Sequence, residues 1–525
     1  MHILLFVPDN HVTRNFVPQL WPFLLRSRTP PGHTVTIIDG NAQRLTTPEI
    51  VRFVNDHGVD LVGMGFMTRM ALRAYETALA LRTQTRARIV FGGPHVTALP
   101  DEPLGRTGLP RAADAVVVGE ADDLWATVVE DAARGALRDV YGGRDGEKPS
   151  LQPYAATDWE QADLGLFDLM RFVPARVAGW LRRLGIPYEK LYVVPVETGR
   201  GCPYGCEFCS VTGFFGGRLR FRSNASVIAE LLALKRRAAR ERALVCAFFI
   251  DDNLAIDRPR LKSLLRAIIE ADACLPWVAQ ISVNLLDDAE LVELIEASGG
   301  RFVFVGLESV DEASLKGAHK SFNRPANYRR VLERLAERNV YAITSFIIGL
   351  EHDRPGTARA IDAEVRAWPP VLPVFGLLTP FPATPLYERM AAAGRLTAPT
   401  HWLSAVPFKA TLDFAHLSAE QAEAEMRQGW ALGYDAAAFR RTERWMRAHG
   451  KPFDAQVMFV VARLIFRGIY FRQGSARSWA RLLAANSPTI ARIAFRRLLG
   501  LEPSHAPAPA AEPALDHRLT GRTML

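Results

Sequence analysis

The sequence predicts an α/β protein in three parts: a doubly wound (Rossmann-like) N-terminal domain, a partial (β/α)6 barrel and a helical C-terminal domain. Apolar, strand-like runs alternate with helical patterns over residues 1–135, and the alternation returns over residues 191–395. It stops after residue 395, where long helical patterns follow. Because 525 residues exceed what one ordinary core can hold, two or three domains are expected.

The N-terminal domain, residues 1–135, contains five short apolar runs that we expect to be strands. They are Ile3 to Val7, Thr34 to Asp39, Leu61 to Phe66, Arg88 to Phe91 and Ala115 to Val118. Helical patterns lie between them, notably over Pro48 to His57 and Ala71 to Thr83. This spacing predicts a parallel sheet, which binds ligands beyond the carboxyl ends of its strands. The turns at those ends carry small or polar residues, namely Gly63, Gly65, Gly92, Gly93, Gly119 and Glu120.

Two segments are expected to lie outside the three folded parts. Residues 136–190 are rich first in Gly, Asp and Pro and then in scattered aromatic residues, which predicts a connector. Residues 502–525 are rich in Pro and Ala, a composition typical of a disordered tail.

The barrel segment, residues 191–395, predicts six strand–helix units. The expected strands are 191–196, 244–250, 277–283, 302–306, 341–348 and 374–379, with helices between them over 226–242, 260–273, 288–297, 327–338 and 357–367. A partial barrel should carry its chemistry at the carboxyl ends of the strands, as full barrels do. Small and polar residues gather at that face, namely Asp251, Asp252, Glu308, Ser309 and Gly349.

A cysteine-rich loop follows the first expected barrel strand. It places Cys202, Cys206 and Cys209 in a C-x3-C-x2-C spacing between Glu197 and Ser210. Three thiolates this close can bind one iron–sulfur cluster through three of its four irons, which leaves the fourth iron open to a small molecule. The alternatives are a zinc site, which would want a fourth Cys or His that this loop lacks, and chance clustering.

The loop resembles the signature of the radical S-adenosylmethionine (SAM) enzymes, C-x3-C-x-aromatic-C, with Phe208 at the aromatic position. The resemblance implies a 4Fe-4S cluster on Cys202, Cys206 and Cys209 whose open iron chelates SAM. It also implies reductive cleavage of SAM to a 5′-deoxyadenosyl radical, with the electron supplied by an external donor of the flavodoxin or ferredoxin type. The cofactors carry the hard chemistry, and the protein supplies orientation and exclusion of water.

The same resemblance implies where SAM is held. Asp251 and Asp252 occupy the place of the family's second-strand Gly-Gly-Glu element, although an aspartate there could instead cap the next helix. Glu308 and Ser309 match the region that contacts ribose or methionine, and Gly349 would allow close approach to adenine. The run Pro380 to Tyr387 resembles a Pro-x-Pro-Gly-Thr-Pro-Leu-Tyr element in which Ala383 replaces glycine, so this turn is expected to avoid strongly positive φ.

The N-terminal domain resembles the cobalamin-binding domain that precedes many radical SAM cores. The resemblance rests on Gly92-Gly93-Pro94-His95 after the fourth strand and on Val118-Gly119-Glu120 after the fifth. It implies that small residues allow the backbone to approach a flat corrin. Asp9 to Arg14 matches the family's Asp-x-His-x-x-Gly motif except that Arg14 replaces glycine. Because related radical enzymes usually lack this ligand, we expect His11 to be a solvated loop histidine and cobalamin to bind without a protein ligand.

The C-terminal domain, residues 396–501, is expected to form helices over 418–446, 453–472 and 476–499. Residues 439–500 carry thirteen Arg or Lys against two acids, Glu443 and Asp454, an excess that is larger than the net charge of +8 of the whole chain. The excess predicts either a helical cap with a solvated basic face or an amphipathic surface that docks on anionic lipid. No nucleic acid is expected, because the region carries no nucleic-acid-binding motif. The interleaved arginines are Arg463, Arg467, Arg472, Arg492, Arg496 and Arg497.

Composition indicates a cytoplasmic protein, with peripheral contact at the inner face of the membrane as an option. Only five cysteines occur, and Cys246 and Cys274 stand alone in apolar surroundings, which argues for a reducing compartment. The apolar start is too short for a signal peptide, and no apolar run reaches the roughly 18–20 residues of a membrane span.

Together these features predict a cobalamin-dependent radical SAM enzyme of the class B methyltransferase type, resembling hopanoid C-2 methylases and anaerobic magnesium-protoporphyrin IX monomethyl ester cyclases. The expected reaction is methyl transfer to an unactivated carbon of an apolar or polycyclic small molecule, such as a lipid or a tetrapyrrole. Two alternatives stay open. One is a radical cyclase or oxidoreductase that uses cobalamin without methyl transfer, and the other is a cobalamin or iron–sulfur sensor.

Overall fold

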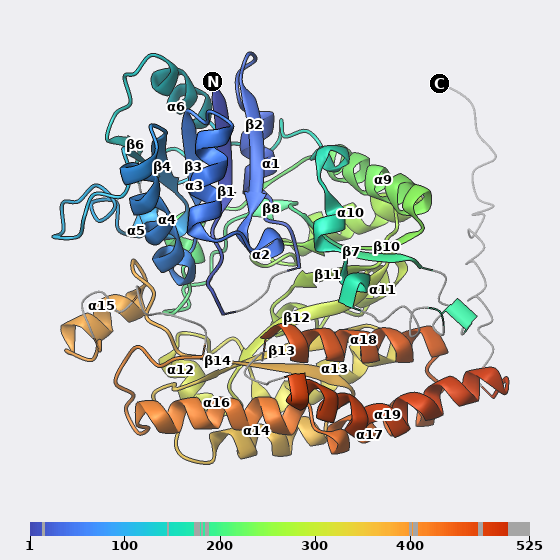
Figure 1. The fold of residues 1–525 in the computed structure, drawn as a ribbon. Helices are drawn as coiled ribbons and strands as arrows, with labels where there is room; N and C mark the ends of the chain where they lie inside the picture. Colours follow the sequence, from blue (N-terminus) through green and yellow to red (C-terminus); the bar gives the residue numbers. More distant parts are fainter. Residues whose placement is uncertain are drawn as a thin grey trace, which may run out of the picture.

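Two six-stranded parallel sheets organise the part of the chain that this computed structural model describes (Figure 1). The described residues are 1–12, 16–143, 146–172, 179, 182–183, 188–397, 402, 408–470 and 476–501. Part of the expected connector and the expected disordered tail, residues 502–525, lie outside them. Nowhere in the described residues does a helix combine the length and the apolar character needed to cross a bilayer.

The first sheet has the strand order β2-β1-β3-β4-β5-β6, with every neighbouring pair parallel. All five expected strands form, and β6 is an additional strand inside the segment expected to be a connector. The strands are β1 (His2–Val7), β2 (Thr34–Asp39), β3 (Leu61–Gly65), β4 (Arg88–Gly92), β5 (Ala115–Val118) and β6 (Val140–Gly142). The helices are α1 (Trp21–Ser27), α2 (Gly40–Gln43), α3 (Thr47–Asp56), η1 (Thr68–Met70), α4 (Ala71–Gln84), α5 (Pro94–Ala98) and α6 (Trp125–Ala133).

The second sheet runs in chain order, β7-β10-β11-β12-β13-β14, with helices between the strands as expected for a partial barrel. Its strands are β7 (Lys190–Val196), β10 (Ala243–Phe249), β11 (Trp277–Gln280), β12 (Gly300–Glu308), β13 (Tyr341–Ile348) and β14 (Val371–Leu377). Its helices are α9 (Asn224–Glu241), α10 (Arg258–Glu270), α11 (Ala289–Ala297), α12 (Glu312–Gly317), α13 (Pro325–Glu337) and α14 (Thr357–Arg366). The shorter elements are η2 (Trp159–Gln161), η3 (Leu164–Phe167), η4 (Leu169–Phe172), α8 (Val211–Phe215), η5 (Val283–Leu285) and the antiparallel pair β8 (Gly199–Arg200) and β9 (Arg220–Phe221).

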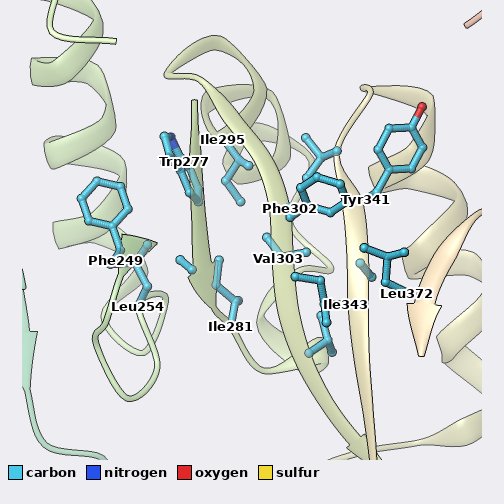
Figure 2. Close-up of a cluster of buried hydrophobic side chains, with 14 of the residues drawn as sticks. Phe249, Leu254, Trp277, Ile281, Ile295, Phe302, Val303, Tyr341, Ile343 and Leu372 are labelled. Atoms are coloured by element: carbon cyan, nitrogen blue, oxygen red, sulfur yellow. The ribbon is translucent and has the colours of Figure 1, made fainter. Parts of the chain in front are cut away.

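Large apolar side chains of neighbouring strands pack together in the barrel core (Figure 2). Burial alternates along β10, as expected for a strand that faces a core on one side. Phe249 of β10 meets Trp277 of β11 edge to face, with 5.4 Å between the ring centroids. The indole of Trp277 donates to Ser298 Oγ (3.1 Å), so its polar atom is satisfied. Truncating Phe249 to Ala should therefore cost about 3–5 kcal/mol.

A small apolar cluster of Phe453, Ile493 and Ala494 stays apart from this core, but most of the C-terminal helices contribute side chains to it. These helices are α15 (Pro385–Ala392), α16 (Ala419–Gly433), α17 (Ala436–Ala448), α18 (Phe453–Tyr470) and α19 (Ala476–Leu498). Phe459 of α18 lies 5.4 Å from the ring of Tyr341, and the Trp430 indole of α16 donates to the Phe375 carbonyl. Arg463 is not part of a solvated basic face, which corrects the expectation for this residue: it is buried, its guanidinium lies over the Tyr434 ring, and it donates to the Gly433 carbonyl.

Candidate functional site

The cysteine loop leaves the carboxyl end of β7 and is held by the small β8–β9 hairpin. Gly201 adopts φ +98°, and any Cβ there would collide with the Arg218 carbonyl, so the loop needs glycine at this position. Cys209 closes a turn by donating its amide to the Cys206 carbonyl (3.1 Å). Burial raises the pKa of all three thiols, that of Cys209 to about 11. Metal binding would have to offset this shift, because the thiolate is the ligand.

The donor set fits an iron–sulfur cluster. Cys202, Cys206 and Cys209 lie on one loop, each only partly exposed, and they are close enough for Cys202 to affect Cys206 and for both to affect Cys209 electrostatically. Within the described part of the chain, no group of three or more His, Cys, Asp or Glu side chains is spaced for a single metal ion. A cluster uses a separate iron for each thiolate, so its ligands stand farther apart than the ligands of one ion.

A buried ion pair beside this loop was not anticipated from the sequence. Lys320 Nζ lies 2.6 Å from Glu308 Oε1, and the ammonium sits 5.8 Å from the centre of the Phe208 ring. Burial opposes the charge of Lys320, but Glu308 and the nearby thiols Cys206 and Cys209 outweigh it and raise the pKa of Lys320. A positive charge is therefore fixed next to the cysteine loop, where it would offset the negative charge of three cluster-binding thiolates.

Glu308 is placed by an irregular strand end. The register of β12 shifts between Gly306 and Glu308, and Glu308 takes φ +66°, which is uncommon for a residue with a side chain. A Cβ on Gly306 would collide with the carboxylate of Glu308 and with the ammonium of Lys320. The glycine at residue 306 therefore leaves room for the pair, whose side-chain ends would have to shift if a Cβ were present.

Asp251 and Asp252 have different surroundings. Asp251 accepts from the amide (2.9 Å) and the hydroxyl (2.7 Å) of Thr198, so its carboxylate fastens the end of β10 to the end of β7. Asp252 accepts from the Gly201 amide (3.1 Å) at the edge of the cysteine loop. Burial raises the pKa of Asp251 to about 6 and that of Asp252 to about 7. Neither caps the next helix, because Asp257 does so.

Two residues of the expected SAM site, Gly349 and Ala383, differ from what the sequence predicted. Gly349 adopts φ +100°, but the ring of Phe414 occupies the space where its Cβ would be, so its small size accommodates Phe414. Ala383 takes φ +60°, which corrects the expectation that this turn avoids positive φ; an alanine pays roughly 1 kcal/mol for that conformation. Ser309 is buried, and its hydroxyl accepts from the Asp311 amide (3.0 Å).

The glycines of the first sheet fall into two groups. Gly63 and Gly65 lie against indole rings, since a Cβ on Gly63 would be 3.2 Å from the Trp125 ring and one on Gly65 would be 3.0 Å from the Trp21 ring. Gly63 is buried in the sheet core, which corrects its expected role in approaching a corrin. Gly92 has no atom nearer than 3.8 Å to its would-be Cβ, and Gly93 brings the backbone against Phe66. Open backbone at Gly92 is what a flat ligand over this edge requires.

Two histidines lie near the same edge. His11 is half exposed, and its Nε2 is 3.2 Å from Glu76 Oε2, as expected for a solvated loop histidine. His95 is fully buried between Thr68 (3.3 Å) and Glu102 (3.4 Å), and Trp402 donates to the same Glu102 carboxylate (3.1 Å). Through these contacts His95 anchors the turn after Gly93 to neighbouring buried residues.

The carboxyl ends of the two sheets face each other across a buried ion-pair network. Arg200, which follows β7, contacts Glu120 (2.6 Å) and Asp122 (2.8 Å), which follow β5, and also Glu197 (2.8 Å). Arg220 binds the other oxygen of Glu120 (2.8 Å). Glu120 is thus committed to the domain junction, which corrects its expected contact with cobalamin. Burial opposes charge on Asp122, but Arg200 outweighs it and lowers the pKa of Asp122.

A second contact joins the far side of the same junction. Arg69, after β3, donates to Thr379 Oγ1 (3.3 Å), after β14, and its guanidinium lies over the ring of Phe381 (5.5 Å). The edge that carries Gly92 and Gly93 and the face that carries the cysteine loop are therefore held opposite each other. Arginines whose partners lie about 80 to 310 residues away leave no local pattern, so these contacts had no sequence signal.

Two family models match the chain, one for each sheet. The B12 binding domain matches residues 24–129, and the Radical SAM superfamily matches residues 196–361. The first match includes the glycine-bearing edge, and the second includes the three cysteines, Asp252 and the Glu308–Lys320 pair.

Several curated proteins are similar to this chain over both sheets. Bacteriochlorophyllide d C-8(2)-methyltransferase of Chlorobaculum tepidum is 26% identical over 378 residues, which are 71% of this chain and 76% of the relative. Hopanoid C-2 methylase of Rhodopseudomonas palustris is 25% identical, covering 73% of this chain and 66% of the relative. The anaerobic magnesium-protoporphyrin IX monomethyl ester cyclase of Rubrivivax gelatinosus is 24% identical, covering 74% and 70%.

Solved structures share the fold. The radical SAM methyltransferase TsrM from Kitasatospora setae, with cobalamin and a 4Fe-4S cluster bound, superimposes with a TM-score of 0.55 at 19% identity, over 76% of each chain. OxsB with aqua-cobalamin and SAM bound gives a TM-score of 0.62 at 12% identity, over 95% of this chain and 80% of OxsB. The overall fold of this chain is therefore shared with both proteins.

Proposed function

The chain is a radical SAM protein with a B12 binding domain, and we propose that it is a cobalamin-dependent methyltransferase acting on an unactivated carbon. The observation that carries the proposal is the junction at Arg200, which holds the Gly92–Gly93 edge opposite the cysteine loop. A methyl carrier and a radical generator must both reach one substrate atom, and this arrangement brings their two sites to a common face. The methyltransferases among its relatives support the same reaction.

The residues of the chain have separable roles in this proposal. When bound, the cluster supplies the electron that cleaves SAM, and cobalamin carries the methyl group. Cys202, Cys206 and Cys209 hold the cluster, and Asp252 lies at the loop edge where a carboxylate can accept from the SAM ammonium. Lys320 fixes a positive charge beside the thiolates. We keep Phe208 and Ser309 as the lining of the SAM site.

The substrate we propose is an apolar or polycyclic molecule of the tetrapyrrole or lipid class. Bacteriochlorophyllide and hopanoid methylation by relatives support this class. The cyclase among the relatives keeps a radical cyclase or oxidoreductase as the alternative. We also propose an external electron donor of the flavodoxin or ferredoxin type and a cytoplasmic location.

Product analysis tests the proposal. The reconstituted protein would be incubated anaerobically with SAM, cobalamin and a reductant, with and without candidate tetrapyrroles, and the products identified by mass spectrometry. S-adenosylhomocysteine and 5′-deoxyadenosine formed together support methyl transfer. Deoxyadenosine alone would favour the cyclase or oxidoreductase, and neither product would favour a cobalamin or iron–sulfur sensor.

We further propose peripheral contact with an anionic membrane through the end of α19. Phe495, Leu498, Leu499 and Leu501 are more than half exposed there, and Arg496 and Arg497 lie among them. Exposed apolar side chains interleaved with arginines are typical of helices that lie in a membrane interface. An apolar substrate would be collected from such a surface.

A further inference from the structure

A cavity of about 320 Å³ lies at the opposite end of the barrel strands from the cysteine loop. Its wall is formed by the start of β14 and the end of α14 on one side and by α17 and Arg463 of α18 on the other. Thr379, at the candidate active face, follows the carboxyl end of β14, whereas the cavity meets its amino end. The seven residues of this strand put the two sites about 20 Å apart. The cavity is thus separate from the site described above.

Positive charge is concentrated in this cavity without matching acids. Arg366, Arg441, Arg444 and Arg463 line it, and no Asp or Glu is among the described lining residues. Arg366 is paired with Asp362 (2.6 Å), but Arg441 and Arg444 have no ion pair or side-chain hydrogen bond within the described residues. An aromatic wall accompanies them, since Trp368 and Trp445 also line the cavity.

Arg463 is the strongest indication that something anionic is missing from the cavity. Its side chain is 95% buried, yet in the described part of the chain it has no carboxylate within ion-pair distance and one hydrogen bond, to the Gly433 carbonyl (2.6 Å). Burial is the main reason that the pKa of Arg463 is lowered to about 10; Tyr434 and Asp435 partly oppose the shift, and Arg441 makes a smaller contribution in the same direction as burial. A buried charge without a paired acid is costly, and a bound anion would compensate it.

We propose that this cavity is a second ligand site, for a flat-ringed organic anion of the nucleotide class. Guanidinium groups bind phosphate or carboxylate oxygens in pairs, and they stack on flat rings together with indoles. A volume of 320 Å³ is at the lower end of the range for small-molecule sites. The site lies between α17 and β14, so a ligand there would brace the C-terminal helices against the barrel rather than take part in the reaction.

Calorimetric titration of the full-length, cluster-reconstituted protein tests this site without turnover. The probes are ATP, inorganic pyrophosphate, adenosine and a carboxylated ring compound, benzene-1,3,5-tricarboxylate. We expect ATP to bind, adenosine not to bind, and pyrophosphate to bind about tenfold more weakly because it lacks the ring. If the tricarboxylate outcompetes ATP, the anion is a carboxylate and the nucleotide class is wrong. Failure of every anionic probe to bind would overturn the site.

Variants on one helix locate the binding. Arg441→Gln/Arg444→Gln removes two charges that line the cavity, and Arg440→Gln/Arg447→Gln removes two charges from the same helix that do not line it. We expect ATP binding to weaken at least about tenfold in the first pair and less than about twofold in the second. Equal losses would show a general charge effect and overturn the proposal. All four side chains are at least partly exposed, so both proteins should fold, and SAM cleavage should be unchanged in both.

Discussion

Lys320 Nζ lies 2.6 Å from Glu308 Oε1, and this buried pair stands beside the cysteine loop with the Phe208 ring next to it. The two residues come from the irregular end of β12 and from the turn after α12. Removing one partner of a buried pair leaves the other charge uncompensated, which typically costs about 3–5 kcal/mol. The pair therefore has consequences for both stability and the cluster environment.

Lys320→Met should lower the free energy of unfolding of the cluster-free protein by about 3 kcal/mol, because Glu308 stays buried without its partner. Adding Glu308→Gln should recover much of this loss, since the buried charge is then gone. Urea unfolding of the single and double variants measures both effects. Lys316→Met, at an exposed position of α12, is the matched control and should change little. If the double variant lost as much free energy of unfolding as the two single variants lose together, the two charges would not interact.

Alanine at Cys202, Cys206 or Cys209 should abolish SAM cleavage and lower the bound iron from about four per chain. Cys246→Ala and Cys274→Ala should keep both, apart from packing costs of about 1 kcal/mol. Iron analysis and deoxyadenosine production after anaerobic reconstitution provide the readouts. Retained cleavage in any of the first three variants would contradict the cluster assignment.

His11→Ala should leave the absorption spectrum of bound cobalamin unchanged, because His11 is half exposed and its ring faces Glu76. The measurement is the corrin spectrum of the reconstituted protein, recorded side by side for wild type and variant. A spectral change of the kind that follows loss of an imidazole ligand would show that His11 coordinates cobalt after all.

Glu241→Gln should remove a pH-dependent part of the stability. Burial alone would raise the pKa of Glu241, but bonds from Lys190 (2.9 Å), Tyr192 (2.9 Å) and Arg237 (2.7 Å) outweigh it and lower the pKa to about 2. Because this value lies below the ordinary 4.5, the stabilisation is complete above pH 4.5 and is lost as the pH falls toward 2.

The free energy of unfolding of the wild type should therefore exceed that of Glu241→Gln by about 1–2 kcal/mol at pH 7, and this difference should shrink below pH 4.5. Thermal unfolding between pH 7 and pH 3 measures it. Glu270→Gln, at an exposed position of α10, should have the same stability as the wild type over this whole pH range. A difference that stays constant with pH would mean that the hydrogen bonds do not depend on the carboxylate charge.

The full-length protein should sediment with anionic liposomes at low salt and be released at high salt, because each basic residue near such a surface contributes about 1 kcal/mol that salt screens. Deleting α18 would remove Phe459 from the core, so point variants are the better probe. Phe495→Ser/Leu498→Ser/Leu499→Ser should abolish sedimentation. Leu72→Ser/Ile269→Ser, at exposed apolar positions elsewhere, should not. Wild-type protein left in the supernatant at low salt would rule out the membrane contact.

The sequence alone predicted the features that depend only on residues close together in the chain. Alternation of apolar runs with helical patterns predicted the two parallel sheets, since two parallel strands need a long crossover, usually a helix, between them. The strand over Tyr341–Ile348 was predicted to the residue. The spacing of Cys202, Cys206 and Cys209 predicted a cluster-binding loop because all three ligands lie in one short segment of the chain. The B12 and Radical SAM domains could be recognised for the same reason.

Only the tertiary structure decided which of the candidate residues are free to meet a ligand. Gly349 is covered by Phe414, and Glu120 is engaged by Arg200 and Arg220, although both looked available at strand ends. Lys320 became a candidate only because the fold brings it to Glu308. Chain spacing fixes which residues are near in sequence, whereas these contacts depend on how two separately formed sheets and a helical layer pack. Their energies come from burial and charge pairing, which no local pattern records.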